Sequence, residues 1–367
     1  MKIIIPMAGM GKRMRPHTLT VPKPLIPIAG KPMVQRIVED LANICPEKIT
    51  EIAYVISRVF GSEAEKNLIA VAEKLGAKGK IYYQDEPLGT AHAILCAKES
   101  LDGKTLVAFA DTLFIPDLKA KADTSKDGII WVQKIADPRQ FGVVKLDKDG
   151  YITDFVEKPQ TFVSDLAIIG IYYFKDGAYL KKEMQYLIDN NLKEKGEYQL
   201  TNAMENMKLK GTRFVTSQVA EWLDCGNKDA TVYTNKRILE TYYSNGHTQK
   251  VNEANVKNSK IISPCIIGDN VQINNSTVGP FASIGSNTII ENSIVENSIV
   301  QRNVKFKNAK LPNSILGNFV EFSGTIVQGG IVQFHGFFLW HHAAVFVQQL
   351  TQFIIIIGIF FVMQGQQ

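Results

Sequence analysis

A cationic, glycine-bearing loop near the start of the chain is the segment best suited to bind an anion. It follows the apolar run "KIIIP" and reads "MAGMGKRMRPHTLTVPKP", with Gly9, Gly11, Arg13 and Lys23 inside it. Such a turn behind a buried strand presents backbone N–H groups to a phosphate, because glycine lets the backbone come close. Arginine adds a planar fork of donors and lysine a point charge. The loop therefore predicts a site for an anionic ligand.

Two common phosphate loops do not match this segment. A dinucleotide fingerprint needs a third glycine, and Met14 stands at that position. A Walker loop needs an earlier glycine and a Ser or Thr behind Gly-Lys, where the chain has Pro6 and Arg13. The loop is therefore expected to hold its anion in another way.

Two aspartates follow apolar runs. Asp111 closes "TLVAFAD" and Asp224 stands in "EWLDCG", so each is expected at the carboxyl end of a strand, where α/β sheets bind ligands. Two such carboxylates suit Mg²⁺, which completes its shell with phosphate and water. The alternative for each aspartate alone is a turn residue or a helix N-cap.

The segment 1–245 alternates strand-like runs with helical patterns, which indicates an α/β fold with a mainly parallel, Rossmann-like sheet and helices on both faces. The expected strands include "EIAYVIS", "KIYYQDE", "GIIWVQK", "FGVVKLD" and "LAIIGIYYF". Ser62 and Glu65 have the spacing of a capping box, which predicts the start of a helix. His92 is expected in the first turn of a helix rather than in catalysis.

The segment 246–324 consists of short repeats. Val278, Ile284 and Ile290 recur every six residues, and a second isoleucine series at 289, 294 and 299 recurs every five. Such short periods are typical of a parallel β-helix, in which each coil buries aliphatic side chains and turns on Gly, Asn or Ser. Ordinary alternation in a β-sandwich is the alternative, and it would not explain these fixed periods.

The segment 325–367 differs from both, since no Asp, Glu, Lys or Arg follows Glu321. It closes on "QFIIIIGIFFVMQGQQ", whose apolar core is shorter than the roughly 20 residues that span a bilayer. A marginal membrane anchor, a buried terminal element and a tail foreign to the parent fold are the alternatives. We favour the last, because β-helices normally end in a polar cap.

Composition narrows the class of protein. A chain of 367 residues with 21% charged residues and a net charge of +5 is globular, and its basic residues are too scattered to favour nucleic-acid binding. Its four cysteines are far apart without a C-x-x-C pair, so neither a zinc site nor a disulfide framework is indicated. A cytoplasmic protein is expected, and no membrane partner unless the tail anchors the chain.

Six pieces of the chain together resemble the sugar-1-phosphate nucleotidyltransferases, a family that includes glucose-1-phosphate thymidylyltransferase and mannose-1-phosphate guanylyltransferase. They are the opening loop, "QDEPLGTAHAI", "FADTLF", "FGVV", "VEKP" and "WLDCG", in family order over about the first 230 residues. Many members carry a left-handed β-helix behind this domain. The chain departs from the usual pattern at Met10, Lys12 and Thr112, which bears on the detailed phosphate and nucleotide contacts.

The resemblance implies roles for particular residues. The nucleotide-binding set is Ala8, Gly9, Gly11, Arg13, Lys23, Gln84 and Gly89, with the last two beside the base. The sugar-phosphate set is Gly142, Glu157, Lys158 and Glu197, with surface ion pairing as the alternative for Glu157 and Lys158. The catalytic set is Arg13, Lys23, Asp111, Lys158 and Asp224, with the two aspartates holding Mg²⁺.

The implied reaction joins an NTP and a sugar 1-phosphate into an NDP-sugar and pyrophosphate, with dTTP and glucose 1-phosphate as the first choice. Uridylyl or guanylyl transfer to glucose or mannose 1-phosphate, and a regulatory relative without turnover, are the alternatives. A β-helix that also transfers acyl groups would generally use a histidine, and the segment 256–324 contains none. The protein is expected to form a homo-oligomer and to bind no nucleic acid.

Overall fold

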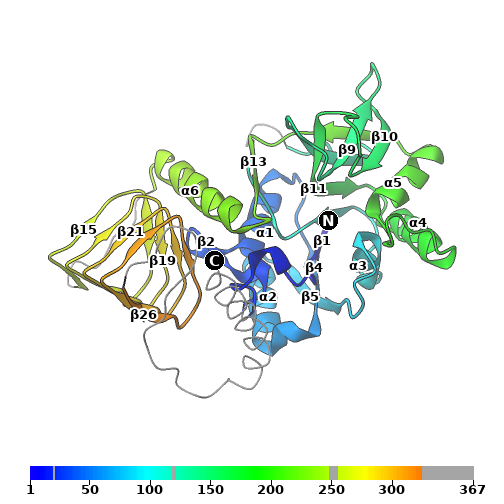
Figure 1. Ribbon diagram of the computed structural model, residues 1–367. Helices are drawn as coiled ribbons and strands as arrows, with labels where there is room; N and C mark the ends of the chain where they lie inside the picture. The colour runs from blue at the N-terminus through cyan, green and yellow to red at the C-terminus, as the bar shows by residue number, and fades with distance from the viewer. Residues whose placement is uncertain (20, 118–120, 248–254, 325–367) are drawn as a thin grey trace, which may run out of the picture.

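The computed structural model describes residues 1–19, 21–117, 121–247 and 255–324. Figure 1 shows an α/β domain beside a stack of short strands, with helix α6 (Lys228–Ser244) between them. The segment 325–367 lies outside the described residues, so the hypothesis that it is a tail foreign to the parent fold stays a prediction.

A nine-stranded sheet forms the centre of the α/β domain. Its parallel part has the order β6-β1-β4-β5, with bounds β1 (Lys2–Pro6), β4 (Glu51–Ile56), β5 (Lys78–Tyr83) and β6 (Thr105–Ala108). These are the strands that the apolar runs predict. All six residues of β4 are buried, as expected of a strand covered on both faces.

The other part of the sheet is antiparallel around one long strand. This strand, β11 (Leu166–Phe174), pairs antiparallel with β6, β8 (Gly128–Lys134) and β9 (Gly142–Leu146). β10 (Ile152–Glu157) pairs antiparallel with β9, and β12 (Phe214–Ser217) runs parallel to β8. The Rossmann-like prediction is confirmed, with a mixed sheet in which the parallel half carries the opening loop.

Helices cover both faces of the sheet because alternate residues of a strand point to opposite sides. Ile3 and Ile5 belong to the apolar cluster that includes residues of α1 (Met33–Ile44) and α2 (Gly61–Lys74). Ile4 belongs to the opposite cluster, with residues of α3 (Thr90–Cys96), α4 (Gly177–Asp189) and α5 (Leu200–Leu209). The sheet is therefore buried between two helical layers.

Two short hairpins lie outside this sheet. β7 (Thr112–Ile115) pairs antiparallel with β13 (Glu221–Asp224), and β2 (Pro27–Ile28) pairs with β3 (Lys31–Pro32). The strand that ends at Asp224 therefore lies in a separate two-stranded sheet, outside the nine-stranded one. Sequence patterns did not reveal this pairing because its two strands are over a hundred residues apart.

The described residues after 255 form three parallel sheets with regular spacing, which is the predicted left-handed β-helix. One inward column runs through Val256, Ile273, Ile290, Phe306 and Phe322, each one coil after the last. The strands are β14 (Val256–Lys257), β15 (Lys260–Ile261), β16 (Cys265–Ile267), β17 (Gln272–Asn274), β18 (Thr277–Val278), β19 (Ala282–Ile284), β20 (Ile289–Glu291), β21 (Ile294–Glu296), β22 (Ile299–Val300), β23 (Lys305–Lys307), β24 (Lys310–Pro312), β25 (Ile315–Leu316) and β26 (Glu321–Ser323).

Asparagines turn the corners of these coils. Asn275, Asn292 and Asn308 all have φ between +47° and +55°, a left-handed conformation that asparagine tolerates better than most residues. Their side-chain amides hydrogen-bond along the stack, at 3.3 Å and 3.2 Å between successive coils. The Asn-rich texture of the sequence thus has a conformational cause.

The two aliphatic series of the sequence have different outcomes. Val278, Ile284 and Ile290 are at most 2% exposed, so the six-residue series marks the interior as predicted. The five-residue series was wrong as an interior marker, since Ile294 points outward and is 45% exposed. Its neighbour Val295 is buried in its place. Ile299 is buried, but within the apolar cluster of the α/β domain.

Helix α6 joins the two parts of the molecule. Its fully buried Asn235 accepts hydrogen bonds from Ala29 N (2.8 Å) and Ser283 Oγ (2.7 Å), and donates to Phe281 O (3.2 Å). Ile315 joins the apolar cluster of the α/β domain. The β-helix is therefore packed on the domain through both apolar and polar contacts.

One helix start differs from its prediction. α2 begins at Gly61, directly behind the short 3₁₀ turn η3 (Arg58–Phe60), and no side chain caps it. Glu65, expected to complete a capping box with Ser62, instead accepts a hydrogen bond from Tyr83 Oη at 2.9 Å. A contact with a neighbouring strand has replaced the local one.

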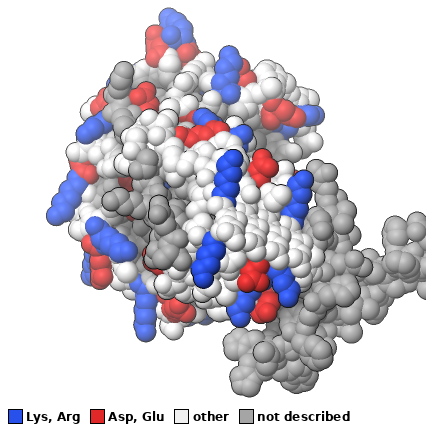
Figure 2. Space-filling view, turned by 90° about the vertical axis from the view of Figure 1, so that its left-hand side faces the viewer, with Lys and Arg blue, Asp and Glu red and all other residues white. Residues whose placement is uncertain are grey.

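Figure 2 shows one face of the molecule, on which acidic and basic side chains alternate without a stripe of one sign. Many of the described lysines and arginines have an acidic partner within 4 Å, as in Lys2–Asp102 and Arg139–Asp137. None of the helices in the described parts of the chain has the length and apolarity that a bilayer crossing needs.

Candidate active site

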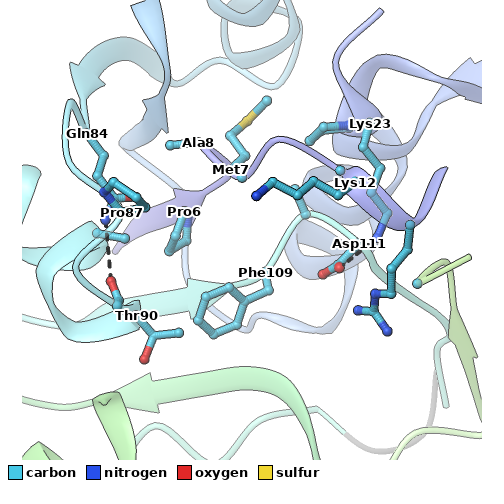
Figure 3. Close-up of a pocket in the computed structure, with 18 of the residues that line it drawn as sticks. Pro6, Met7, Ala8, Lys12, Lys23, Gln84, Pro87, Thr90, Phe109 and Asp111 are labelled. Carbon is cyan, nitrogen blue, oxygen red and sulfur yellow. Dashed lines mark hydrogen bonds and ion pairs between the residues drawn. The ribbon is translucent and has the colours of Figure 1, made fainter. Parts of the chain in front are cut away.

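A cavity of about 410 Å³ lies at the carboxyl end of β1 (Figure 3). It is lined by Pro6, Met7, Ala8, Gly9, Gly11, Lys12, Arg13, Lys23, Pro24, Gln84, Pro87, Gly89, Thr90, Ala93, Phe109, Ala110, Asp111, Glu197 and Gly226. The structure thus brings all seven predicted nucleotide-binding residues and Asp111 to the wall of one cavity. It lies where open α/β sheets bind ligands.

The opening loop is fixed at both ends of its glycine segment. Met7 N donates to Val55 O of the adjacent strand at 2.8 Å, and Thr18 Oγ1 donates to Gly11 O at 2.9 Å. Gly11 has φ +56° and precedes the 3₁₀ turn η1 (Lys12–Met14), whose Met14 is buried in the core. A side chain at Gly9 would meet no atom within 4 Å. Packing within the protein therefore does not require a glycine at position 9, which lines the cavity.

Lys23 is the most buried cation of the site, only 8% exposed, in the 3₁₀ turn η2 (Lys23–Leu25). Its Nζ donates to Asp111 Oδ2 at 2.8 Å, as the dashed line in Figure 3 shows. A buried ammonium needs such a partner, because an unpaired charge in the interior is costly. The lysine therefore neutralises Asp111 at the floor of the cavity.

Asp224, the last residue of β13, lies beside Asp111, which directly precedes β7. Thr112 is opposite Asp224 in the β7–β13 register, and Cys225 N donates to Asp111 O at 3.0 Å. Burial raises the pKa of Asp224, and the nearby charge of Asp111 raises it further. A hydrogen bond from the Gly226 backbone and the charges of Lys23 and Arg13 lower it. The site is thus a pair of interacting carboxylates under a cationic loop.

A tight backbone contact shapes the opposite wall. Gly89 has φ +115°, and a Cβ there would lie 2.5 Å from Tyr198 O and 2.9 Å from Glu197 Cβ. Two hydrogen bonds join the segments, Tyr198 N to Leu88 O at 2.8 Å and Ala91 N to Tyr198 O at 2.9 Å. This approach brings Glu197 to the cavity, so Gly89 has a clear packing role as well as a place in the lining.

The remaining predicted residues, Gly142, Glu157, Lys158 and Asp224, are not among those that line the cavity. Gly142 is opposite Glu157 in the β9–β10 pair, and a Cβ at Gly142 would lie 3.2 Å from Glu157 Oε2. Lys158 follows β10 with φ +44°, and its Nζ is 3.5 Å from Glu157 Oε1. The ion pair that the sequence left as an alternative is therefore present. Asp224 also lies outside the lining, although its neighbour Gly226 is part of it.

Several residues of the site were missed by the sequence. A Cβ at Gly226 would lie 2.8 Å from Asp224 Oδ2 and would displace that carboxylate, and the motif "WLDCG" already contained that signal. Thr90 Oγ1 accepts a hydrogen bond from Leu200 N at 2.9 Å and so fixes the first residue of α5 beside the cavity. Phe109 and Pro87 supply apolar wall. Cys225 is fully buried, which raises its thiol pKa to about 12, and is a packed residue as expected.

The fold and the cavity together define a class of protein: an α/β domain that holds a cationic loop against paired carboxylates, followed by a β-helix. A sequence model of the family described as "Nucleotidyl transferase" matches residues 2–241. The chain belongs to the nucleotidyl transferase family.

Two relatives illustrate the range of that family. The chain is 30% identical over 307 residues to a glucose-1-phosphate thymidylyltransferase of Streptomyces antibioticus, with 78% of this chain and 83% of the relative covered. It is 34% identical over 192 residues to a mannose-1-phosphate guanylyltransferase catalytic subunit beta of Drosophila pseudoobscura pseudoobscura, with half of each chain covered.

A solved structure shares the fold. It is a Bacillus anthracis protein described as a glucose-1-phosphate thymidylyltransferase in complex with sucrose. The match has a TM-score of 0.53 and 22% sequence identity, and covers 64% of this chain and 93% of the other. At that identity the likeness supports the fold alone.

Proposed function

We propose that this chain transfers a nucleotidyl group from an NTP to a sugar 1-phosphate, with dTTP and glucose 1-phosphate as the preferred pair. The observation that carries the proposal is the single cavity lined by the glycine loop, Arg13, Lys23 and Asp111. Its phosphate-binding chemistry fits the reaction that the Streptomyces relatives are named for. Guanylyl transfer to mannose 1-phosphate is the second candidate, favoured by the Drosophila relatives.

In this proposal an oxygen of the sugar phosphate attacks the α-phosphorus, and the bond between the α-phosphorus and its bridging oxygen breaks. Pyrophosphate leaves with the electron pair. The nucleophile is already an anion, so no side-chain base is needed, and catalysis consists of positioning and charge neutralisation. The loop amides near Gly9 and Gly11 bind the triphosphate, and Arg13 with Lys23 stabilises the departing pyrophosphate.

Asp111 and Asp224 fit a divalent cation. The charge of Asp111 helps to raise the pKa of Asp224, an effect that a bound cation would relieve. No cluster of three or more His, Cys, Asp or Glu with metal-binding geometry occurs in the described ranges, and a two-carboxylate site suits Mg²⁺ because phosphate and water complete its shell. When bound there, Mg²⁺ would neutralise charge on the α-phosphate.

On the acceptor side, Lys158 aligns the incoming phosphate. Its exposed ammonium lies 3.5 Å from Glu157 Oε1, while Glu157 and Glu197 accept hydrogen bonds from sugar hydroxyls. At Gly142 the absence of a side chain would let the sugar ring approach the backbone, opposite Glu157 in the β9–β10 pair.

The test is pyrophosphate release from the full chain with Mg²⁺, over a grid of dTTP, UTP, GTP, ATP and CTP against glucose, mannose and N-acetylglucosamine 1-phosphates. Release that requires both substrates supports the proposal, and glucose 6-phosphate serves as a matched control without an anomeric phosphate. Absence of release across the grid would favour the regulatory alternative.

The metal assignment has its own test in Asp111→Asn and Asp224→Asn, which keep side-chain size and remove the charge. Each should leave the unfolding temperature little changed and abolish most turnover, and the double variant should lose much less than the product of the single losses because the two act as a unit. A single variant with near-parent turnover would contradict the assignment.

A further inference from the structure

His92 does not line the cavity itself, but it contacts Gln84, which does. It is in the first turn of α3, as the sequence predicts, and its Nδ1 is 3.1 Å from Gln84 Nε2. Gln84 stands on the cavity wall, and its Nε2 also approaches Gly89 O at 3.4 Å, the second dashed line of Figure 3. Both contacts use the same end of the glutamine amide.

These contacts determine which way the amide points. A backbone carbonyl only accepts hydrogen bonds, so the amide group facing Gly89 O must be the NH₂ of Gln84. That NH₂ has two hydrogens, and the second is directed at His92 Nδ1. Nδ1 must then accept, which makes His92 a neutral imidazole with its proton on Nε2.

The surroundings of His92 keep it neutral. Burial lowers its pKa, and the carboxylate and backbone of Glu86 only partly oppose this effect. An imidazolium would place an Nδ1–H against the Gln84 NH₂, two donors facing each other. The arrangement is thus stable only with the neutral ring.

We propose that His92 is a positioning residue for base selection: it holds Gln84 so that the amide oxygen, and not the NH₂, is offered to the nucleobase. No described residue hydrogen-bonds Gln84 Oε1, which leaves that oxygen as the free acceptor of a cavity-lining side chain.

The base class follows from this acceptor. Thymine and uracil present N3–H and guanine presents N1–H, which an amide oxygen can accept. Cytosine N3 and adenine N1 carry no proton and would face that oxygen with a second lone pair. A site built to bond a substrate N–H strongly rejects an analogue without it. This inference rests on the proposed function for the nucleotide itself and narrows the nucleotide to those whose base carries a ring N–H on its Watson–Crick edge.

Two variants separate positioning from packing. His92→Leu keeps bulk and removes the acceptor, whereas His92→Asn can place an amide oxygen near the position of Nδ1. The readout is the binding of dTTP, UTP, GTP, CTP and ATP by titration calorimetry without sugar phosphate. A positioning role changes the ratio of affinities between bases, whereas a structural defect weakens all five alike.

Among nucleotides whose base carries such a ring N–H, the parent chain should bind its best one at least about a hundredfold more tightly than CTP or ATP. His92→Leu should reduce that ratio about tenfold or more, the value of one lost hydrogen bond, and His92→Asn should keep most of it. Equal binding of CTP or ATP by the parent, or an unchanged ratio in His92→Leu, would overturn the proposal.

A measurement on the parent chain is independent of variant folding. The ¹⁵N shifts of the His92 ring should show an unprotonated Nδ1 and a protonated Nε2 near neutral pH, and a proton on Nδ1 would overturn the inference. Because neither readout needs turnover, absence of pyrophosphate release would refute the proposed reaction and leave base selection to be judged separately.

Discussion

Gly9→Ala should separate ligand binding from folding. In the structure a Cβ at Gly9 would meet nothing within 4 Å, and the residue does not have a positive φ. The substitution should therefore change the free energy of unfolding by only a few tenths of a kcal/mol, as expected of a residue that gains no clash. If Gly9 is needed to let phosphate approach the loop backbone, the new methyl group should displace that phosphate.

The magnitude follows from what the methyl group would break. One charge-assisted hydrogen bond from a loop amide to phosphate contributes about 1.5–3 kcal/mol, which corresponds to about a ten- to hundredfold increase in the KM for NTP. The KM for the sugar phosphate should change little. The assay is initial-rate kinetics of pyrophosphate release with each substrate varied, together with thermal unfolding of the same samples.

Two other glycines provide controls. Gly317→Ala, at a β-helix corner with no atom within 4 Å of the added Cβ and no positive φ, should change neither KM nor unfolding. Gly11→Ala should destabilise the loop itself, since Gly11 has φ +56° and its Cβ would lie 3.0 Å from Thr18 Cγ2. A parent-like KM for NTP in Gly9→Ala would refute the phosphate role of this glycine.

Two further predictions concern charge. Lys158→Ala should lower kcat/KM for the sugar phosphate about ten- to hundredfold with little change in NTP binding. Substitution of the exposed Lys148 by Ala is the control. An equal loss of NTP affinity in Lys158→Ala would show that the lysine does not act on the sugar phosphate alone. Burial raises the pKa of Asp40 to about 7 from an ordinary 3.8, the effects of Arg36, Glu39 and Lys31 being smaller. Between about pH 4 and 7 the folded chain therefore keeps the Asp40 proton, whereas the unfolded chain loses it. The contribution of Asp40 lowers the free energy of unfolding progressively as pH rises through this range, by at most about 4 kcal/mol. Asp40→Asn should flatten that part of the urea-unfolding profile, and an unchanged pH slope would contradict the assignment.

Much of the fold could be predicted because its strands are long apolar runs. β4 and β11 are buried along nearly their whole length, so local composition was enough to find them. The β7–β13 hairpin could not be predicted, since its strands are four residues each and distant in sequence. The five-residue series did not mark the coil interior at Ile299 either, because this residue is buried against the α/β domain.

The candidate site was predictable to a different extent. Spacing and residue type identified the loop and both aspartates, because chemistry limits which residues can hold phosphate. The contacts that orient those residues were hidden: Lys23 pairs with Asp111 88 residues away, and His92 contacts Gln84 across a loop. Such partners depend on the tertiary fold, which a local pattern does not contain.

The most direct test of the central claim is ³¹P NMR of the products formed by the full chain from dTTP and glucose 1-phosphate with Mg²⁺. Nucleotidyl transfer predicts the coupled signals of a sugar-linked diphosphate and an equal amount of pyrophosphate, with both appearing only when the two substrates are present. Nucleoside monophosphate with pyrophosphate would contradict it, because water would then be the nucleophile at the α-phosphorus. Nucleoside diphosphate with inorganic phosphate would also contradict it, because the bond to the γ-phosphate would then be the one that breaks.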